Sequence, residues 1–290
     1  MPIPAADDPC LNDRVSLLPE RVRWPVSALR WRLRGHYRPL PPAFTDPLRG
    51  ARVIEIGGPS APFRAGGLVP VYPLAASVDN NQFAASSKWH SLDPAVDEFA
   101  PSGTPIGRQH FIDDLALPSI ADNAYDAVIS SHVIEHLANP LRAFETWTRI
   151  IRPGGHLLMI VPHFQGTFDR RRPVTPLSHL VEDHEQGTPE GDATHVEEVI
   201  ELHDFDRDVG SRTETWIADH RSNISTRVVH HHVFSTASLL LMVDCAGLEI
   251  LQHTTRFPHD IYVLARFPVV GSRPDNAAVL HHVDPGPFDR

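Results

Sequence analysis

The chain has 290 residues, of which 41% are hydrophobic and 8% aromatic, which is enough apolar material for a large buried core. This composition excludes an intrinsically disordered protein, and a chain with only two cysteines cannot be a disulfide scaffold or a zinc ribbon. The 36 acidic residues against 26 basic ones give a net charge of −10, which disfavours nucleic acid and anionic membranes as partners. No window approaches the roughly 18 apolar residues of a spanning helix, so a cytoplasmic protein without a membrane span is expected.

The chain begins with a proline-punctuated N-terminal extension (residues 1–48), in which one short helix is expected within residues 21–38. After this extension, short apolar runs alternate with helical patterns over most of the chain. The runs predict strands at residues 53–56, 75–78, 125–129, 157–161, 248–252 and 261–267. Helices are expected between the capping residue Asn139 and Pro153, and over residues 236–246. Nearly all-apolar strands that alternate with helices predict an α/β fold with a doubly wound, mostly parallel sheet.

The segment 164–229 interrupts this alternation, because it is rich in acids and histidines. Within it, a capping box that begins at Thr194 predicts one short helix near residues 195–204. Strand and helix patterns resume after this segment, and the proline-rich residues 269–290 are expected to form a flexible tail. The segment is therefore predicted to be an insertion in the α/β domain.

Two strand ends carry acids and one of them is followed by glycines. Glu55 precedes the turn Gly57-Gly58-Pro59, where residues without side chains allow the backbone to approach a ligand, and Asp79 follows the second predicted strand. The dinucleotide fingerprint GxGxxG is absent. Taken alone, an acid before two glycines is more often a strand-to-turn junction than a ligand site.

Three further motifs follow in order: IDDLALP at residues 112–118, DAVISSHVIEHL at 126–137 and RPGG at 152–155. With these motifs in this order and at these spacings, the chain closely resembles the class I S-adenosylmethionine-dependent methyltransferases, specifically the type 11 group. The resemblance is strong over residues 52–163 and weak over residues 236–267. It implies a seven-stranded Rossmann-like methyltransferase fold, S-adenosylmethionine as cofactor and S-adenosylhomocysteine as product, but it is nearly silent about the methyl acceptor.

The resemblance assigns the first two strand ends to the cofactor. It implies that Glu55, Gly57 and Gly58 lie at the methionine side of the cofactor, where backbone and carboxylate meet the ammonium group. It also implies that Asp79 accepts hydrogen bonds from both ribose hydroxyls, a task that suits a carboxylate because it acts only as an acceptor.

The later motifs extend this assignment. By the resemblance, Asp113, with Asp114 as the alternate register, lies near the adenine amino group. Ser131 and His132, at the end of the predicted strand at 125–129, would contact the cofactor and border the acceptor. The domain organisation that follows is a cofactor-binding core at residues 49–163, an acceptor-site lid at 164–229 and the C-terminal part of the core at 230–268.

The glycine turn departs from the family's usual Gly-x-Gly-x-Gly, because Pro59 and Ala61 stand at the second and third glycine positions. Proline has no N–H, so a backbone contact to the cofactor at this position is lost. This departure motivates one alternative from another class of protein, a methyltransferase-like binding domain without turnover.

Two histidines are candidates for the catalytic base. His163 follows the predicted strand at 157–161 and His132 follows the one at 125–129, and ligands of open parallel sheets bind beyond the carboxyl ends of the strands. A histidine that titrates near neutral pH can remove the proton of an acceptor as the methyl group is transferred. His163 is the first choice and His132 the second, with a structural hydrogen bond as the alternative for each.

The segments at 168–173 and 230–234 look like those of methyltransferases associated with bacterial sugar and polysaccharide synthesis. This likeness favours O-methylation of a hydroxyl of a sugar or oligosaccharide, with an N- or O-methyltransferase of a specialised metabolite as the alternative. The candidate acceptor-binding residues are Asp169, Arg170, Arg171, His230 and His232, since arginine forks recognise anions and also line sugar sites. The arginines agree equally well with an ordinary surface loop that binds no ligand.

No metal ligand is assigned from the sequence. His195 and His203 do not form the HExxH pattern, and His230 and His232 share one face of an extended segment, which is typical of a polar strand rim. The acidic pairs at 182–183 and 197–198 are interpreted as a solvated face, and a magnesium site from such oxygen ligands stays an open alternative. The sequence also leaves open whether the protein forms a homodimer.

Overall fold

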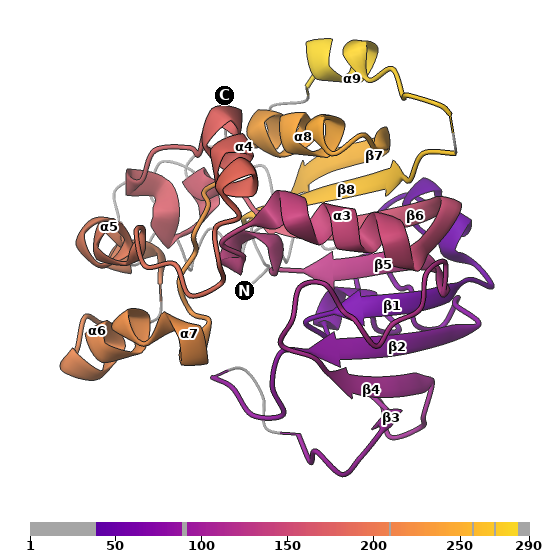
Figure 1. The fold of residues 1–290 in the computed structure, drawn as a ribbon, viewed down its shortest axis with the longest axis horizontal. Coiled ribbons are helices and arrows are strands. Elements are labelled where there is room, and N and C mark those ends of the chain that lie inside the picture. Colours follow the sequence, from indigo (N-terminus) through magenta and orange to yellow (C-terminus); the bar gives the residue numbers. More distant parts are fainter. Residues whose placement is uncertain (1–38, 89–91, 209, 257, 270, 284–290) are drawn as a thin grey trace, which may run out of the picture.

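The computed structural model describes residues 39–88, 92–208, 210–256, 258–269 and 271–283. The helix expected within residues 21–38 and the last residues of the expected tail lie outside the described residues. The strands are β1 (Arg52–Ile56), β2 (Ser77–Gln82), β3 (Glu98–Phe99), β4 (Gly107–Phe111), β5 (Tyr125–Ser131), β6 (Ile151–Pro162), β7 (Glu249–Arg256) and β8 (Asp260–Arg266). They form one eight-stranded sheet in the order β3-β4-β2-β1-β5-β6-β8-β7 (Figure 1).

The centre of this sheet is parallel and its two edges are antiparallel. Strands β4, β2, β1, β5 and β6 pair in parallel. β8 runs antiparallel to both β6 and β7, and the two-residue β3 runs antiparallel to β4. The chain proceeds from β1 outward to β4 and then returns to place β5 on the other side of β1, so the strand order reverses between β1 and β5. The prediction of a doubly wound, mostly parallel sheet is confirmed, with the short β3 as an eighth strand.

The predicted end of the second strand is wrong. β2 does not stop before Asp79 but continues to Gln82. The polar residues Asn80 and Asn81 are tolerated in this buried strand because their amides are paired: Asn80 Nδ2 donates to Gln109 Oε1 at 2.9 Å, and Asn81 Nδ2 donates to the Ile112 carbonyl at 3.3 Å. These amide pairs join β2 to β4 and the residue after it, which explains why neither segment shows an apolar strand pattern.

The α-helices of the described residues are α3 (Pro140–Ile150), α4 (Leu177–Gln186), α5 (Val196–Leu202), α6 (Glu214–Arg221), α7 (Asn223–Thr226), α8 (Thr236–Cys245) and α9 (Ala277–His281). Short 3-10 turns are η1 (Pro42–Phe44), η2 (Asp46–Leu48), η3 (Ala61–Phe63), η4 (Ile134–His136), η5 (Phe164–Gly166), η6 (Phe168–Arg171) and η7 (Phe205–Arg207).

Three predicted helices are found. Asn139 caps α3, since its Oδ1 accepts the Arg142 N–H at 3.0 Å, and α8 lies within the predicted residues 236–246. α5 is present, but the capping box at Thr194 is wrong, because the Thr194 hydroxyl donates to Asp192 and His195 is the N-cap residue. α4, α6, α7 and α9 were not predicted from the sequence. α9 lies in residues 269–290, where a flexible tail was expected, and its Val279 and Leu280 pack against the main core.

Apolar side chains cover both faces of the sheet. One core contains Phe144 and Trp147 of α3, Leu239 and Leu240 of α8, and Leu180 of α4. A second core on the other face gathers side chains from residues 40–78, β5, β6 and β8. Each fully buried large side chain contributes about 1.5–3 kcal/mol. Because Leu180 belongs to the first core, the start of the 164–229 segment packs as part of the main body.

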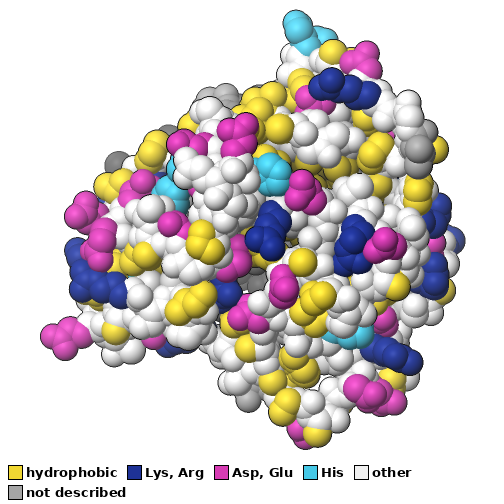
Figure 2. All heavy atoms as spheres, viewed as in Figure 1, with side chains coloured by type: hydrophobic (Ala, Val, Ile, Leu, Met, Phe, Trp, Pro, Cys, Tyr) yellow, Lys and Arg dark blue, Asp and Glu magenta, His cyan; other side chains and the backbone are white. Residues whose placement is uncertain are grey.

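The rest of that segment stands beyond the carboxyl ends of the parallel strands. In Figure 1, α5, α6 and α7 lie beside the arrowheads of β5, β1 and β2. They have a small core of their own, formed by Val196, Val199, Ile200 and Val229. Acidic and basic side chains are interspersed over the face shown in Figure 2. Among the described residues, no helix has the length and apolar character needed to cross a bilayer.

Candidate functional site

A cavity of about 590 Å³ opens where the parallel strands end and the 164–229 segment begins. This is the edge of the sheet where the strand order reverses, which is the usual ligand site of such sheets. Its lining includes Ile56, Gly57, Gln82, Phe83, Asp113, Asp114, Ser131, His132, His136, Trp147, Phe168, Glu190, Arg227, His230 and His259. One wall therefore comes from strand ends and the opposite wall from the insertion.

The glycine turn after β1 is required by close packing. Gly57 has a φ of +82°, and a Cβ at this position would lie 2.6 Å from Val133 Cγ2. A Cβ on Gly58 would lie 2.1 Å from a carboxylate oxygen of Glu55. Gly57 lines the cavity, whereas Gly58 covers Glu55 and is not among the lining residues.

Glu55 is buried beneath this turn and does not line the cavity. Its carboxylate accepts the Tyr72 hydroxyl at 2.6 Å and the Ser60 N–H at 3.0 Å. Burial raises the pKa of Glu55 to about 7, although both hydrogen bonds act in the opposite direction. The structure thus places Glu55 as a support of the turn, away from the position where the resemblance puts its carboxylate against the cofactor.

Asp79 lies in the middle of β2 and does not line the cavity. Its carboxylate accepts the Arg108 N–H at 2.8 Å and the Tyr125 hydroxyl at 2.7 Å. Burial opposes its ionisation, but hydrogen bonds, including these two, lower the pKa of Asp79. The expected position at a strand end is wrong because β2 runs on to Gln82, which lines the cavity in its place.

The residues expected after β4 and β5 do reach the cavity. Asp113, Asp114 and Ser131 are part of its lining. Asp113 Oδ1 is 2.9 Å from Arg227 of the insertion, and Arg227 also pairs with Glu190 at 2.9 Å. Arg227 was not identified from the sequence, because nothing near it in the chain marks a residue that bridges to Asp113.

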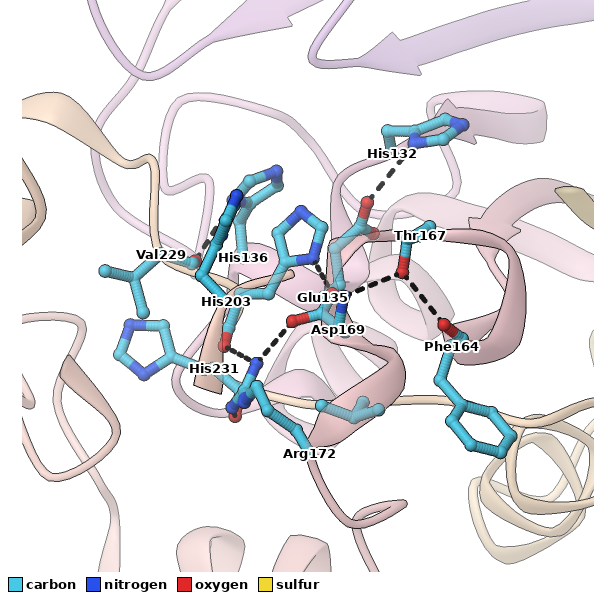
Figure 3. A network of polar contacts seen from close by, with 12 residues as sticks. His132, Glu135, His136, Phe164, Thr167, Asp169, Arg172, His203, Val229 and His231 are labelled. Atoms are coloured by element: carbon cyan, nitrogen blue, oxygen red, sulfur yellow. Dashed lines mark hydrogen bonds and ion pairs between the residues drawn. The ribbon is translucent and has the colours of Figure 1, made fainter. Parts of the chain in front are cut away.

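His132 lines the cavity but is held as a cation. Its Nε2–H donates to Asp260 at 3.1 Å, and its Nδ1 is 3.6 Å from Glu135 (Figure 3). Burial opposes protonation, but the Asp260 hydrogen bond and the charges of Glu135 and Asp260 raise the pKa of His132 to about 9. An imidazole that is already protonated at neutral pH cannot accept a proton, so the geometry disfavours the expected base role.

His163 does not reach the cavity. The side chain is buried, and its Nδ1 accepts the Gln165 N–H at 3.3 Å as the N-cap of η5. It is not among the lining residues. The expectation that His163 faces the cleft is wrong, since the chain turns inward directly after β6.

His230 and Asp169 form a pair with the geometry of a base and its orienting carboxylate. His230 lines the cavity, and its Nδ1 is 2.5 Å from Asp169 Oδ2, which leaves Nε2 as the second ring nitrogen. Asp169 also accepts Arg172 Nη1 at 2.8 Å (Figure 3). Burial opposes ionisation, but His230 and Arg172 lower the pKa of Asp169 to about 2, so this buried carboxylate is charged.

The other predicted acceptor-binding residues lie elsewhere. Arg170 and Arg171 both pair with the fully buried Asp204, and the Arg171–Asp204 contact is 2.9 Å long. Neither arginine lines the cavity. His232 is buried outside the cavity lining, beside Asp183. These three assignments are corrected: the arginines hold the insertion together because Asp204 needs two cations to compensate its burial.

The acids considered for magnesium do not converge. Glu197 pairs with Arg221 at 2.8 Å, and Glu198 pairs with Arg172 at 2.7 Å. Glu182 accepts a hydrogen bond from Gln186 on its own helix. Arginine and glutamine partners occupy these three carboxylates, whereas the fourth acid, Asp183, lies beside His179 and His232.

Comparisons with known proteins agree with the motifs. Residues 103–159 match a family described as "Methyltransferase domain". The chain is 30% identical over 128 residues to an uncharacterized methyltransferase of Mycobacteroides abscessus, covering 42% of this chain and 43% of that protein. The chain thus matches less than half the length of this relative.

Solved structures of similar proteins include methyltransferases from distant organisms. A SAM-dependent methyltransferase from Methanosarcina mazei is 13% identical, with a TM-score of 0.44, and the match covers 80% of this chain and 99% of that one. A 1,6-didemethyltoxoflavin-N1-methyltransferase from Burkholderia thailandensis, solved with 1,6-didemethyltoxoflavin and S-adenosylhomocysteine, is 12% identical, with a TM-score of 0.44 and 92% coverage of each chain.

Proposed function

We propose that the protein is an S-adenosylmethionine-dependent methyltransferase that methylates a hydroxyl group of a small acceptor. One observation carries this proposal: a single cavity joins the glycine turn and strand ends of the methyltransferase motifs to the His230–Asp169 pair on the opposite wall. A cofactor on the first wall and an acceptor on the second would meet inside this cavity. The family match over residues 103–159 supports the cofactor assignment.

The first wall has the features that this cofactor needs. The bare backbone of Gly57 allows close approach, since a side chain there is excluded by Val133. The Gln82 amide nitrogen donates to the Gly58 carbonyl, so its Oε1 remains as an acceptor for a ribose hydroxyl. Phe83 offers an apolar face for the adenine beside Asp113.

The second wall has the features that deprotonate an acceptor. When bound, the cofactor supplies a methyl group activated by its sulfonium charge. His230 Nε2 takes the proton of the acceptor hydroxyl, while Asp169 holds the ring in the tautomer whose Nδ1–H is donated. The charged Asp169 then stabilises the imidazolium that forms. His132, a cation held by Asp260 and Glu135, contributes positive charge to the cavity lining.

For the acceptor we propose a hydroxyl of a sugar or oligosaccharide. The cavity combines the aromatic rings of Phe168 and Trp147 with the hydrogen-bonding groups of Glu190 and Arg227. Such a mixture of apolar faces and polar groups suits a ring with many hydroxyls. A specialised metabolite methylated on nitrogen or oxygen is the alternative acceptor, and a binding domain without turnover is the alternative motivated by Pro59 and Ala61.

Two measurements test this proposal. Titration calorimetry with S-adenosylmethionine and S-adenosylhomocysteine is expected to show one site per chain. Transfer of a radiolabelled methyl group is then screened over nucleotide sugars, oligosaccharides and aromatic metabolites. Binding without transfer to any acceptor would support the binding-domain alternative, transfer to a metabolite alone would overturn the saccharide acceptor, and absence of cofactor binding by the folded protein would refute the methyltransferase assignment.

A further inference from the structure

A second group of histidines lies outside the cavity lining. His179 and Asp183 are one turn apart on the same face of α4, His195 is the N-cap residue of α5, and His232 lies just before α8. We call these four residues the histidine cluster. Three segments that are distant in the sequence therefore meet here, where the insertion contacts the main body of the protein.

The ligand atoms of the cluster are close together. His179 Nε2 is 3.0 Å from His195 Nε2 and 3.4 Å from Asp183 Oδ2. The same Asp183 oxygen is 3.8 Å from His232 Nε2. Each of the three histidines also offers a ring nitrogen that lies within 4.8 Å of those of the other two.

These separations match those between ligands of one metal ion. Bonds of about 2.0–2.1 Å from a tetrahedral zinc ion to nitrogen or oxygen place two ligand atoms about 3.3–3.4 Å apart. Three contacts, of 3.0, 3.4 and 3.8 Å, lie on both sides of this value. A bound ion would draw the remaining histidine nitrogens, which lie within 4.8 Å of one another, toward this separation.

Hydrogen bonds within the protein satisfy the cluster only in part. His179 bonds to His195, and His232 Nε2 donates to the Ala138 carbonyl at 3.3 Å. Asp183 Oδ2 and His232 Nδ1 are both buried without a hydrogen-bond partner, and the His232 side chain is only 1% exposed. An unsatisfied buried polar group costs free energy, which a bound cation would recover.

The surroundings of the cluster orient its ligands as in known metal sites. Thr188 donates its hydroxyl to Asp183 Oδ1 at 3.0 Å, which directs Oδ2 toward the histidines. Imidazole nitrogens suit zinc and similar transition metals, whereas magnesium requires oxygen ligands. Three histidines with one carboxylate therefore favour zinc.

We propose that the histidine cluster binds one zinc ion that ties α4 and the start of α5 to the segment before α8. Its role would be structural, because none of the four residues lines the cavity. The ion would also hold the segment that carries His230, which is two residues before His232. It is distinct from the proposed methyl-transfer chemistry.

The full chain, stripped of metal with a chelator, provides the test. Titration with zinc chloride is expected to show one tight site per chain and a rise in melting temperature of several degrees, because a ligand of the native state stabilises it. His195→Ala is expected to weaken zinc binding by more than about 100-fold, since loss of even an outer partner of a ligand costs 10–100-fold. His184→Ala, on the same helix α4 but bonded to Glu145, is the matched control and should bind as the wild type does.

Three results would overturn the proposal: no stoichiometric zinc binding by the wild type, unchanged affinity in His195→Ala, or loss of zinc in His259→Ala alone. The last outcome would place the ion at His132, His259 and Asp260, a group of potential ligands at the cavity. Circular dichroism checks that each variant folds, and Asp183→Asn replaces His195→Ala if that variant does not. Cobalt substitution should give the intense visible bands of a tetrahedral site, and weak octahedral bands would contradict four-coordinate geometry.

Discussion

Replacement of His230 by alanine is expected to slow methyl transfer without releasing the cofactor. A positioned general base contributes about 10²- to 10⁴-fold to the rate, which corresponds to about 3–5 kcal/mol of transition-state stabilisation. The 2.5 Å contact with the charged Asp169 orients the ring. Because His230 lies on the wall opposite the glycine turn, the dissociation constant of S-adenosylmethionine should change little.

Asp169→Asn tests whether the two residues act as one unit. The asparagine keeps the size of the side chain but removes the charge that stabilises the imidazolium, so kcat is expected to fall while the protein still folds. The double variant should be little slower than His230→Ala alone, since a lost base needs no orienting partner.

The assay is transfer of a labelled methyl group under single-turnover conditions, combined with calorimetry of cofactor binding. His184→Ala, which removes a histidine of α4 bonded to Glu145, controls for the general effect of removing a histidine. A His230→Ala enzyme that is folded and retains kcat within about threefold of the wild type would refute the assignment of this residue as the base, given the expected effect of at least about 10²-fold.

Three further changes test the rest of the site. Asp79→Ala should leave cofactor affinity nearly unchanged and lower stability by about 1–3 kcal/mol, whereas Gln82→Ala should weaken cofactor binding about tenfold. Calorimetry measures the affinities and thermal melts the stability, and a large affinity loss in Asp79→Ala would return that residue to the ribose site. His132 should titrate near pH 9 by NMR. Because this pKa lies above the ordinary value of 6.5, the stabilisation that the charged ring provides is present below about pH 6.5 and is lost as the pH rises through 9. A His132→Gln variant whose alkaline unfolding equals that of the wild type would contradict this pKa. Arg227→Ala removes the link to Asp113 and should speed hydrogen exchange in α6 and α7, and unchanged exchange would show that the link does not hold the insertion.

Local patterns were sufficient for much of the sheet and its helices. Apolar runs marked β1, β5, β6 and β8, since a strand covered on both faces must be apolar along its length. The cap at Asn139 marked the start of α3 because it depends on neighbouring residues alone. The order of the motifs indicated the family that residues 103–159 match.

Polar strands could not be recognised in the same way. β2 and β4 carry buried amides whose partners lie on the neighbouring strand, so only the assembled sheet shows that these groups are satisfied. The predicted end of β2 therefore put Asp79 just after the strand, three residues before the true strand end at Gln82. The position of Asp79 relative to the cavity thus depended on a strand boundary that local patterns did not show.

The chemistry of the site was decided by tertiary structure. The sequence placed His230 and Asp169 among the candidates, but only the folded chain brings Nδ1 of one to 2.5 Å from the carboxylate of the other. It also holds His132 protonated and turns His163 away from the cavity. A residue type can be read from the sequence, whereas burial, charge state and partners depend on segments that meet only after the sheet and the insertion have packed together.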